Sequence, residues 1–226
     1  MPSRVEPVAR VFEELSGRYD AWYETASGRA LFALELASLR PLLEGSVRPQ
    51  LEVGVGSGRF AAALGLDVGI DLAAAPLRLA RPRGLAVVRG AGTQLPFRAG
   101  TFGAVVLVVT LCFATDPAGL LAEAHRVLRP GGRLVAGVVP LDSPWGRAYA
   151  AEGRAGHPFY RHARFLTVAE FRSQLLSAGF TVVDGRSTLL QAPGREPAEE
   201  PVRRGIAPGA GFVALSAVGA PPAGSR

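Results

Sequence analysis

Three alternating glycines, Gly54, Gly56 and Gly58, lie between a short apolar run and a helical pattern in residues 50–60, QLEVGVGSGRF. Glycine tolerates positive φ and has no Cβ, so such a turn can bring bare backbone N–H groups against a ligand. The spacing is G-x-G-x-G, whereas the dinucleotide fingerprint G-x-G-x-x-G would need a glycine at Arg59. The turn therefore predicts a cofactor site, and its spacing alone does not define the cofactor.

An acidic residue, Asp71, ends the next apolar run, residues 68–71. In a doubly wound sheet the end of the second strand faces the same crevice as the first glycine turn, where a carboxylate can accept both ribose hydroxyl hydrogens. The alternative is an N-cap for the following helix, which Pro76 near the first turn supports. The position of Asp71 relative to the glycine turn favours the ligand role.

Strands and helices alternate regularly after Pro49, which predicts an α/β fold with a doubly wound sheet. The apolar run at residues 102–110 has no alternation, as expected for a strand buried on both faces. We expect seven strands, mostly parallel with an antiparallel last strand, and helices on both faces. The expected strands are residues 50–53, 68–71, 85–89, 102–110, 133–139, 180–190 and 211–218, and the expected helices are 57–64, 117–128 after an Asp116 cap, and 167–178 with a Thr167/Glu170 capping box.

Two aromatic-rich segments flank this core. Residues 6–15 show helical spacing, and Tyr19, Trp22 and Tyr23 then fall in an expected loop before a second helix at residues 30–43. Such aromatics form either a lid over a pocket or a hydrophobic plug. We interpret the chain as a single domain, 1–226, divided into an N-terminal helical lid (1–44), a cofactor-binding core (45–140), an inserted substrate cap (141–165), a C-terminal helix with closing strands (166–218) and a frayed tail (219–226).

Composition narrows the function classes. The net charge is +6 with a pI near 10.6, but all 25 basic residues are arginines spread from Arg4 to Arg226, which favours a solvated basic surface over nucleic-acid binding. The single cysteine, Cys112, excludes an internal disulfide and a cysteine-based metal site. No signal core or long apolar run is present, so we expect a cytoplasmic protein without membrane insertion. The absence of Asn suits a thermophile, and a homodimer is compatible with the sequence.

Five ordered motifs, LEVGVGSG, VGID, LPF, TLCFATDP and EAHRVLRPGGRL, resemble class I S-adenosylmethionine-dependent methyltransferases across roughly residues 45–140. Within that family they look like the small-molecule branch related to the ubiquinone and menaquinone methyltransferases. The later segments SPWGRAY, FYRHARFLT and LLSAGF resemble a bacterial subgroup, mostly of unassigned substrate, one member of which has been labelled histamine-methyltransferase-like. The resemblance implies methyl transfer from S-adenosylmethionine to an unidentified small-molecule acceptor by in-line displacement, with S-adenosylhomocysteine as product.

The resemblance also implies cofactor contacts. Glu52 and the backbone of Gly54, Gly56 and Gly58 would hold the amino-acid part, and Asp71 the ribose. The adenine would lie near Leu72, Thr93, Gln94 and Leu95. The sulfur of the cofactor would lie above Thr110, Leu111 and Cys112. Tyr19 and Trp22 would cover the cofactor. The chain departs from the pattern at Ala91, where many relatives have an adenine-binding Asp, and at Gly103, where Asp is also usual.

The acceptor site is expected between the amino-terminal aromatics and the inserted segment, over the carboxyl ends of the fourth and fifth strands. No catalytic base is defined; Tyr23, His157 and Tyr160 are candidates, with a surface position as the alternative for His157. His125 is expected to be exposed or packed, and Cys112 is a poor nucleophile among apolar neighbours. The candidate substrate-binding residues are Tyr23, Trp145, His157, Tyr160, Arg161 and Arg164.

Two other function classes remain open. A cofactor-binding but catalytically silent methyltransferase-like protein is motivated by Ala91 and Gly103. An RNA or DNA methyltransferase is motivated by the high pI, but TLCF stands where many such enzymes have an Asn-Pro-Pro-Tyr-type motif.

Overall fold

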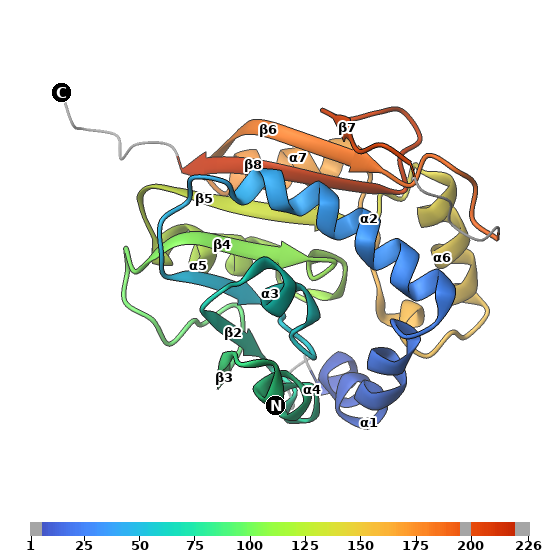
Figure 1. The fold of residues 1–226 in the computed structure, drawn as a ribbon, viewed down its shortest axis with the longest axis horizontal. Coiled ribbons are helices and arrows are strands. Elements are labelled where there is room, and N and C mark those ends of the chain that lie inside the picture. Colours follow the sequence, from blue (N-terminus) through green and yellow to red (C-terminus); the bar gives the residue numbers. More distant parts are fainter. Residues whose placement is uncertain (1–5, 195–199, 220–226) are drawn as a thin grey trace.

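The computed structural model describes residues 6–194 and 200–219, which form one mixed sheet with helices on both faces (Figure 1). The strand order is β3-β2-β1-β4-β5-β8-β6-β7. Neighbouring strands among β3, β2, β1, β4 and β5 pair in parallel, and β8 is antiparallel to both β5 and β6. The strands are β1 (Gln50–Val53), β2 (Val68–Asp71), β3 (Ala86–Arg89), β4 (Phe102–Val108), β5 (Leu128–Val138), β6 (Phe180–Thr188), β7 (Arg203–Arg204) and β8 (Phe212–Gly219).

The predicted sheet is confirmed, with one additional strand. The expected seven strands are present, and β7 pairs antiparallel with the end of β6 as an eighth. A two-residue strand has no measurable period, so sequence patterning could not find it. The expected strand at residues 133–139 begins earlier, at Leu128, because the Pro130-Gly131-Gly132 stretch belongs to β5.

Two layers of helices bury the two faces of the sheet. In Figure 1, α2 (Ala26–Leu43) crosses in front of the sheet and α5 (Pro117–Val127) and α7 (Val168–Ser177) lie behind it. Along β4, Val106 contributes to the front core and Val105 to the back core, as alternation requires for a strand covered on both sides. The remaining helices are α1 (Glu6–Trp22), α3 (Arg59–Leu64), α4 (Ala74–Ala80), α6 (Pro144–Arg154) and the short 3₁₀ turns η1 (Arg81–Arg83), η2 (Leu111–Phe113) and η3 (Tyr160–His162).

The expected aromatic loop after residue 15 is wrong, because α1 continues to Trp22. Gly17 does not break the helix, because aromatic packing stabilises it. The centre of the Phe12 ring lies 5.6 Å from that of Tyr19 and 5.3 Å from that of Phe159. Tertiary contacts of this kind routinely override the weak helix propensity of one glycine. Tyr19 and Trp22 are therefore fixed on a helix, while Tyr23 lies in the turn between α1 and α2.

Several local predictions are confirmed. Asp116 caps α5 by accepting the N–H of Gly119, and Thr167 and Glu170 form the capping box of α7. Gly103 stands where a Cβ would lie 1.9 Å from the carbonyl oxygen of Val47, so a close backbone contact at the start of β4 explains this departure from the family pattern. The predicted frayed tail lies beyond Gly219, outside the described residues. Among the described residues, no helix combines the length and the hydropathy needed to span a membrane.

Candidate functional site

A cavity lies between α1 and the carboxyl ends of β1, β2 and β4, the edge where a doubly wound sheet binds ligands. Figure 1 shows α1 at this end of the sheet, beside α4. The cavity lining is formed by Val8, Ala9, Phe12, Ser16 and Tyr19 of α1, by Val53, Gly54, Gly56 and Ser57, by Ile70, Asp71, Leu72 and Pro76, by Gly90, Ala91, Gly92 and Thr93, and by Val108, Val109, Thr110, Phe113, Ala114, Thr115, Asp116 and Leu120.

The glycine turn requires glycine at all three positions, since Gly54, Gly56 and Gly58 have φ of 76°, 52° and 80°. At Gly54 an added Cβ would lie 2.5 Å from the Thr110 side chain. At Gly56 an added Cβ would meet no heavy atom within 4 Å, because this residue faces the cavity. Gly54 thus allows close packing of β1 on β4, and Gly56 leaves open space for a ligand.

Asp71 ties the end of β2 to the glycine turn. Its Oδ2 accepts the N–H of Gly56 at 2.9 Å, and its Oδ1 accepts the N–H of Ala73 at 2.9 Å. Burial raises the pKa of the Asp71 carboxyl, although the bonds from Ala73 and Gly56 oppose the increase. Further hydrogen bonds from hydroxyl groups would stabilise this buried carboxylate, and the ribose of a nucleoside would supply them.

The end of β4 is strained. Val109 has φ of 51°, a left-handed conformation that is rare for a β-branched residue, and it lines the cavity. Its N–H donates to Gly137 O at 2.9 Å, while the next residue, Thr110, donates its hydroxyl to Val53 O at 3.2 Å. Such strain persists only where the surroundings enforce it, and it is concentrated at functional sites.

Seven of the predicted cofactor residues line the cavity: Tyr19, Gly54, Gly56, Asp71, Leu72, Thr93 and Thr110. The structure does not bring Gly58, Gln94, Leu95, Leu111 or Cys112 to the lining; Leu95, Leu111 and Cys112 are buried in the core, and Gln94 is exposed. Trp22 lies outside the cavity at the end of α1, where it is 38% exposed. Glu52 lies buried in β1, and its Oε2 has no hydrogen-bond partner among the described residues.

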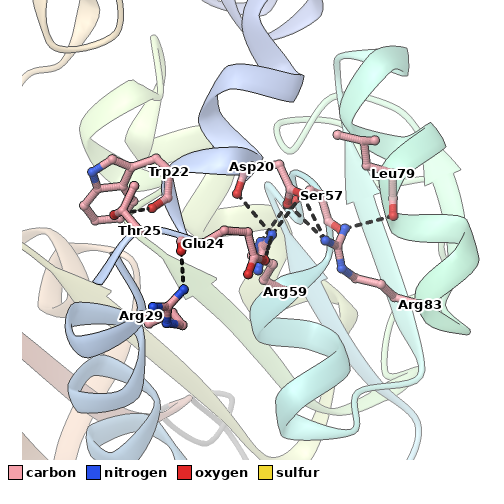
Figure 2. Close-up of polar contacts among 9 residues, drawn as sticks. All are labelled: Asp20, Trp22, Glu24, Thr25, Arg29, Ser57, Arg59, Leu79 and Arg83. Atoms are coloured by element: carbon pink, nitrogen blue, oxygen red, sulfur yellow. Dashed lines mark hydrogen bonds and ion pairs between the residues drawn. The ribbon is translucent and has the colours of Figure 1, made fainter. Parts of the chain in front are cut away.

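Asp20 fastens the carboxyl end of α1 to the glycine turn (Figure 2). Its carboxylate accepts from Arg59 Nε at 2.7 Å and from Arg83 Nη2 at 3.0 Å, while Arg83 also donates to the Ser57 carbonyl at 2.6 Å. Burial alone would raise the pKa of Asp20, but hydrogen bonds from Arg59, Ser57 and Arg83 lower it to about 2. The Arg59 guanidinium also lies 5.3 Å from the centre of the Tyr23 ring.

Glu13 fastens the middle of α1. Its Oε2 accepts the N–H groups of Ala74 at 2.7 Å and Ala75 at 3.0 Å, so a side chain of α1 caps α4, whose own N-cap residue, Ala73, offers none. These bonds, led by the one from Ala75, lower the pKa of Glu13. Together with Asp20, Glu13 holds α1 as a wall of the cavity.

A second polar group lies beside this wall. Glu35, on the inner face of α2, is only 9% exposed, and it forms no hydrogen bond or ion pair with any described residue. Burial raises the pKa of Glu35 to about 8. Burial raises the pKa of Tyr19, Tyr23 and Tyr149, and the charge of Glu35 adds to the increase. We call these three residues, with Tyr160 stacked on Tyr149, the tyrosine cluster. Glu35 was not among the predicted site residues, although a lone acid inside the apolar helix LFALELASL was a signal for it.

The predicted acceptor residues divide between this cluster and the surface. Tyr23 is buried, and Tyr160 is half-buried and stacks on Tyr149 with ring centres 4.5 Å apart. Trp145 is buried and donates its Nε1–H to the Gln191 carbonyl at 2.7 Å, which is a packing role.

The other candidates lie outward. His157 stacks on Tyr160 at 4.2 Å and accepts its backbone N–H through Nδ1 at 3.3 Å. Arg161 and Arg164 are exposed, and Arg161 lines a separate outer groove beside α1. His125 packs on Phe180 with ring centres 5.1 Å apart. Within the described ranges no three His, Cys, Asp or Glu side chains are grouped to hold a metal ion.

Comparison with known proteins identifies the family. Residues 51–136 match a family described as a methyltransferase domain. A crystal structure from Thermotoga maritima, described as a SAM-dependent methyltransferase and "possible histamine N-methyltransferase", is 32% identical, with a TM-score of 0.86, over 93% of this chain and 99% of that one. This chain belongs to the class I S-adenosylmethionine-dependent methyltransferases.

Two further proteins are similar in sequence to this methyltransferase. An uncharacterized protein of Mycobacterium tuberculosis is 47% identical over 88% of this chain and 70% of its own length. A demethylmenaquinone methyltransferase of Corynebacterium kroppenstedtii is 31% identical over 56% of this chain and 57% of its own length. The predicted resemblance to this family, and its Rossmann-like fold, are confirmed.

The residues of this methyltransferase fit the cofactor that its family uses. Gly56 leaves space where a Cβ would point into the cavity, Asp71 presents a buried carboxylate, and Glu52 Oε2 is a buried acceptor to which no described residue donates. The predicted N-terminal lid includes Tyr19 of this lining, but the other α1 residues of the lining were not predicted from the sequence. Val8, Phe12 and Ser16 recur at helical spacing, but periodicity predicts only a buried face and not what that face covers.

Proposed function

We propose that this methyltransferase binds S-adenosylmethionine in the cavity beneath α1 and methylates a small-molecule acceptor by direct in-line displacement. The single observation that carries the proposal is the bond from Gly56 N to Asp71 Oδ2, which joins the open glycine turn to a carboxylate on the cavity wall. The cofactor supplies an electrophilic methyl group on a sulfonium. That chemistry needs no metal and no covalent intermediate. It needs alignment of the acceptor with the methyl group and exclusion of water.

Each part of the chain has a task in this proposal. Asp71 holds the ribose, Glu52 accepts from the ammonium of the methionine part, and Thr93 borders the adenine side. Ala91 leaves that side without the usual acid, and Asp71 and Asp116 are the two acids on the described lining. Residues 1–44 serve as the cover and residues 141–165 as the cap of the acceptor space. Tyr23, Tyr149 and Tyr160 lie where these two segments meet.

The similar proteins give two different kinds of acceptor. The Thermotoga maritima protein is described with an amine acceptor, and the Corynebacterium kroppenstedtii protein with a quinone precursor. Methylation of a nitrogen or of a ring carbon places different demands on the acceptor space. The choice between them therefore depends on the side chains that surround the acceptor in this chain.

Titration calorimetry with S-adenosylhomocysteine tests the proposal. Wild type should bind one equivalent, Asp71→Ala should bind at least about 10-fold more weakly because the ribose loses a charged acceptor, and the exposed Asp142→Ala serves as the control for charge. Absence of binding to wild type would overturn the proposal. Tight binding without turnover of a broad acceptor panel would favour the catalytically silent alternative, and salt-dependent tRNA binding would favour a nucleic-acid substrate.

A further inference from the structure

We propose that Asp116 recognises the base of the bound nucleoside and selects a base that carries an amino group, as adenine does. This inference rests on the proposed function, and it assigns a specificity-determining residue to the cofactor cavity. From the sequence, Asp116 is expected only as the cap of α5. In the structure it also lines the cavity, beside the loop of residues 90–93.

The position of Asp71 defines the base end of the cavity. With the ribose on Asp71, the base must lie against a neighbouring part of the same lining. The Gly90 N–H donates to the Asp71 carbonyl oxygen at 3.0 Å, so the loop of residues 90–93 begins directly beside Asp71. All four residues of this loop line the cavity. The glycine turn lies on the other side of Asp71 and receives the methionine part, so the base lies against residues 90–93.

The side chains of this loop do not distinguish one purine from another. Gly90, Ala91 and Gly92 have no polar side-chain atom, and Thr93 has a hydroxyl. A hydroxyl both donates and accepts hydrogen bonds, so it accommodates an amino group and a carbonyl oxygen equally well. Selection by a side chain requires a group that only donates or only accepts.

Helix α5 brings such a group to the base end. An added Cβ at Gly92 would lie 3.2 Å from Leu120 Cδ1, so the loop packs on the first turn of α5. The Leu120 N–H donates to the Asp116 carbonyl oxygen at 3.1 Å, and both residues line the cavity. Further along α5, Glu123 accepts the N–H of Leu95 at 2.7 Å. The loop and α5 therefore form one wall around the base.

The Asp116 carboxylate has one oxygen that its structural role does not use. Its Oδ1 accepts the Gly119 N–H at 2.9 Å and thereby caps α5. No described residue donates to Oδ2, and no described arginine forms an ion pair with this carboxylate. Serine and asparagine cap helices about as well as aspartate, so the cap does not require a second carboxylate oxygen. Asp116 is exposed, and a ligand can reach it at the rim of the cavity.

The chemistry of a carboxylate favours an amino purine. An ionised carboxylate accepts hydrogen bonds and cannot donate them. The amino group of adenine would donate to Asp116, whereas the carbonyl oxygen of hypoxanthine would set two acceptors against each other. Asp71, the other acid of the described lining, already accepts a backbone N–H at each of its oxygens. Asp116 is therefore the acid that selects the base.

Binding of two nucleosides tests this inference. The probes are S-adenosylhomocysteine and S-inosylhomocysteine, in which a carbonyl oxygen replaces the amino group of adenine. Wild type should bind S-adenosylhomocysteine roughly 10-fold or more tightly than S-inosylhomocysteine. Asp116→Ser keeps a capping oxygen but loses the second acceptor, so the preference should fall below about 3-fold.

Asp116→Asn separates base recognition from helix capping. Its Oδ1 can still cap α5, which places the amide Nδ2, a donor, where the second carboxylate oxygen was. This donor pairs with the carbonyl oxygen of hypoxanthine and not with the amino group of adenine. S-inosylhomocysteine should therefore bind this variant roughly 3-fold or more tightly than it binds wild type. A residue that only caps α5 would not change the preference between the two bases.

Asp142→Asn is the matched control. Asp142 is also exposed and also accepts a backbone N–H, from Val168 at 3.2 Å, but it lies outside the described cavity lining. This variant should keep the wild-type preference.

Three results would each overturn the inference. They are equal affinity of wild type for the two nucleosides, a preference that survives in Asp116→Ser, and an Asp116→Asn variant that binds S-inosylhomocysteine no more tightly than wild type does. Failure of wild type to bind S-adenosylhomocysteine would instead contradict the proposed function itself.

Discussion

The carboxylate of Asp20 and the guanidinium of Arg59 join the last turn of α1 to the first residue of α3, with 2.7 Å between Oδ1 and Nε. Both side chains are largely buried, at 17% and 16% exposed, and Arg83 supplies a second guanidinium to the same carboxylate. This pair makes the position of one cavity wall depend on the residue that follows the glycine turn.

Asp20→Asn should loosen α1 and weaken binding of S-adenosylhomocysteine by roughly 10-fold, since breaking a partly buried pair costs about 1–2 kcal/mol after allowance for solvent. Because the folded pKa of about 2 lies below the ordinary value of 3.8, the stabilisation is present above pH 3.8 and is lost as pH falls toward 2. Calorimetry and acid unfolding check both effects. The control is Glu14→Gln, which breaks the exposed pair with Arg10 on the same helix. It should change the affinity for S-adenosylhomocysteine less than about 2-fold. Equal effects of the two variants would contradict the role of Asp20.

Gly56→Ala should block the cofactor without unfolding the protein. Gly56 and Gly45 both have positive φ, and neither has a heavy atom within 4 Å of an added Cβ, so each alanine costs about 1–2 kcal/mol of backbone strain. Only the methyl group at residue 56 projects into the cavity. We expect similar losses in urea stability for Gly56→Ala and Gly45→Ala, and a loss of S-adenosylhomocysteine binding of at least about 10-fold for Gly56→Ala alone.

Glu35→Gln should stabilise the free protein as pH rises. The folded pKa of about 8 lies above the ordinary value of 4.5, so the contribution of Glu35 to stability is fully present below pH 4.5 and is lost as pH rises through 8. Glutamine carries no charge to bury. Urea unfolding at pH 5 and at pH 8.5 should show the variant gaining stability relative to wild type at the higher pH, while Glu44→Gln stays within about 0.5 kcal/mol at both.

Cys112 should not react with thiol reagents in the folded protein. It is buried, burial raises its pKa to about 12, and its Sγ–H donates to the Val109 carbonyl. Incubation with iodoacetamide at pH 8, followed by mass spectrometry, should leave native protein unlabelled and label the urea-unfolded chain once. Rapid labelling of native protein would show that η2 opens readily.

The doubly wound, mostly parallel sheet and its ligand-binding edge could be predicted from the sequence, because the glycine turn, Asp71 and the apolar run of β4 depend on local patterns. The extent of α1 could not be predicted from the sequence. Gly17 and the glycine-bounded aromatics indicate a loop, and only packing of Phe12 and Tyr19 on Phe159, far along the chain, makes the segment a helix.

The candidate site, too, could be predicted only in part. Residues on the glycine turn and the strand ends were predicted, while Val8, Phe12 and Ser16 were missed because their role depends on where α1 lies. Glu35 was missed for a related reason. The lone acid in LFALELASL indicates a buried polar position, but its lack of a partner among the described residues is a property of the folded surroundings.

Tyr19 borders the cofactor cavity, and its hydroxyl contacts that of Tyr23, a candidate acceptor residue, so cofactor and acceptor would share one side chain. If the first ligand fixes the ring, the second no longer has to order it. Thermodynamic linkage then requires that each ligand change the affinity of the other by the same factor. The two sites would therefore behave as a cooperative pair, in which the order of binding leaves the total free energy unchanged.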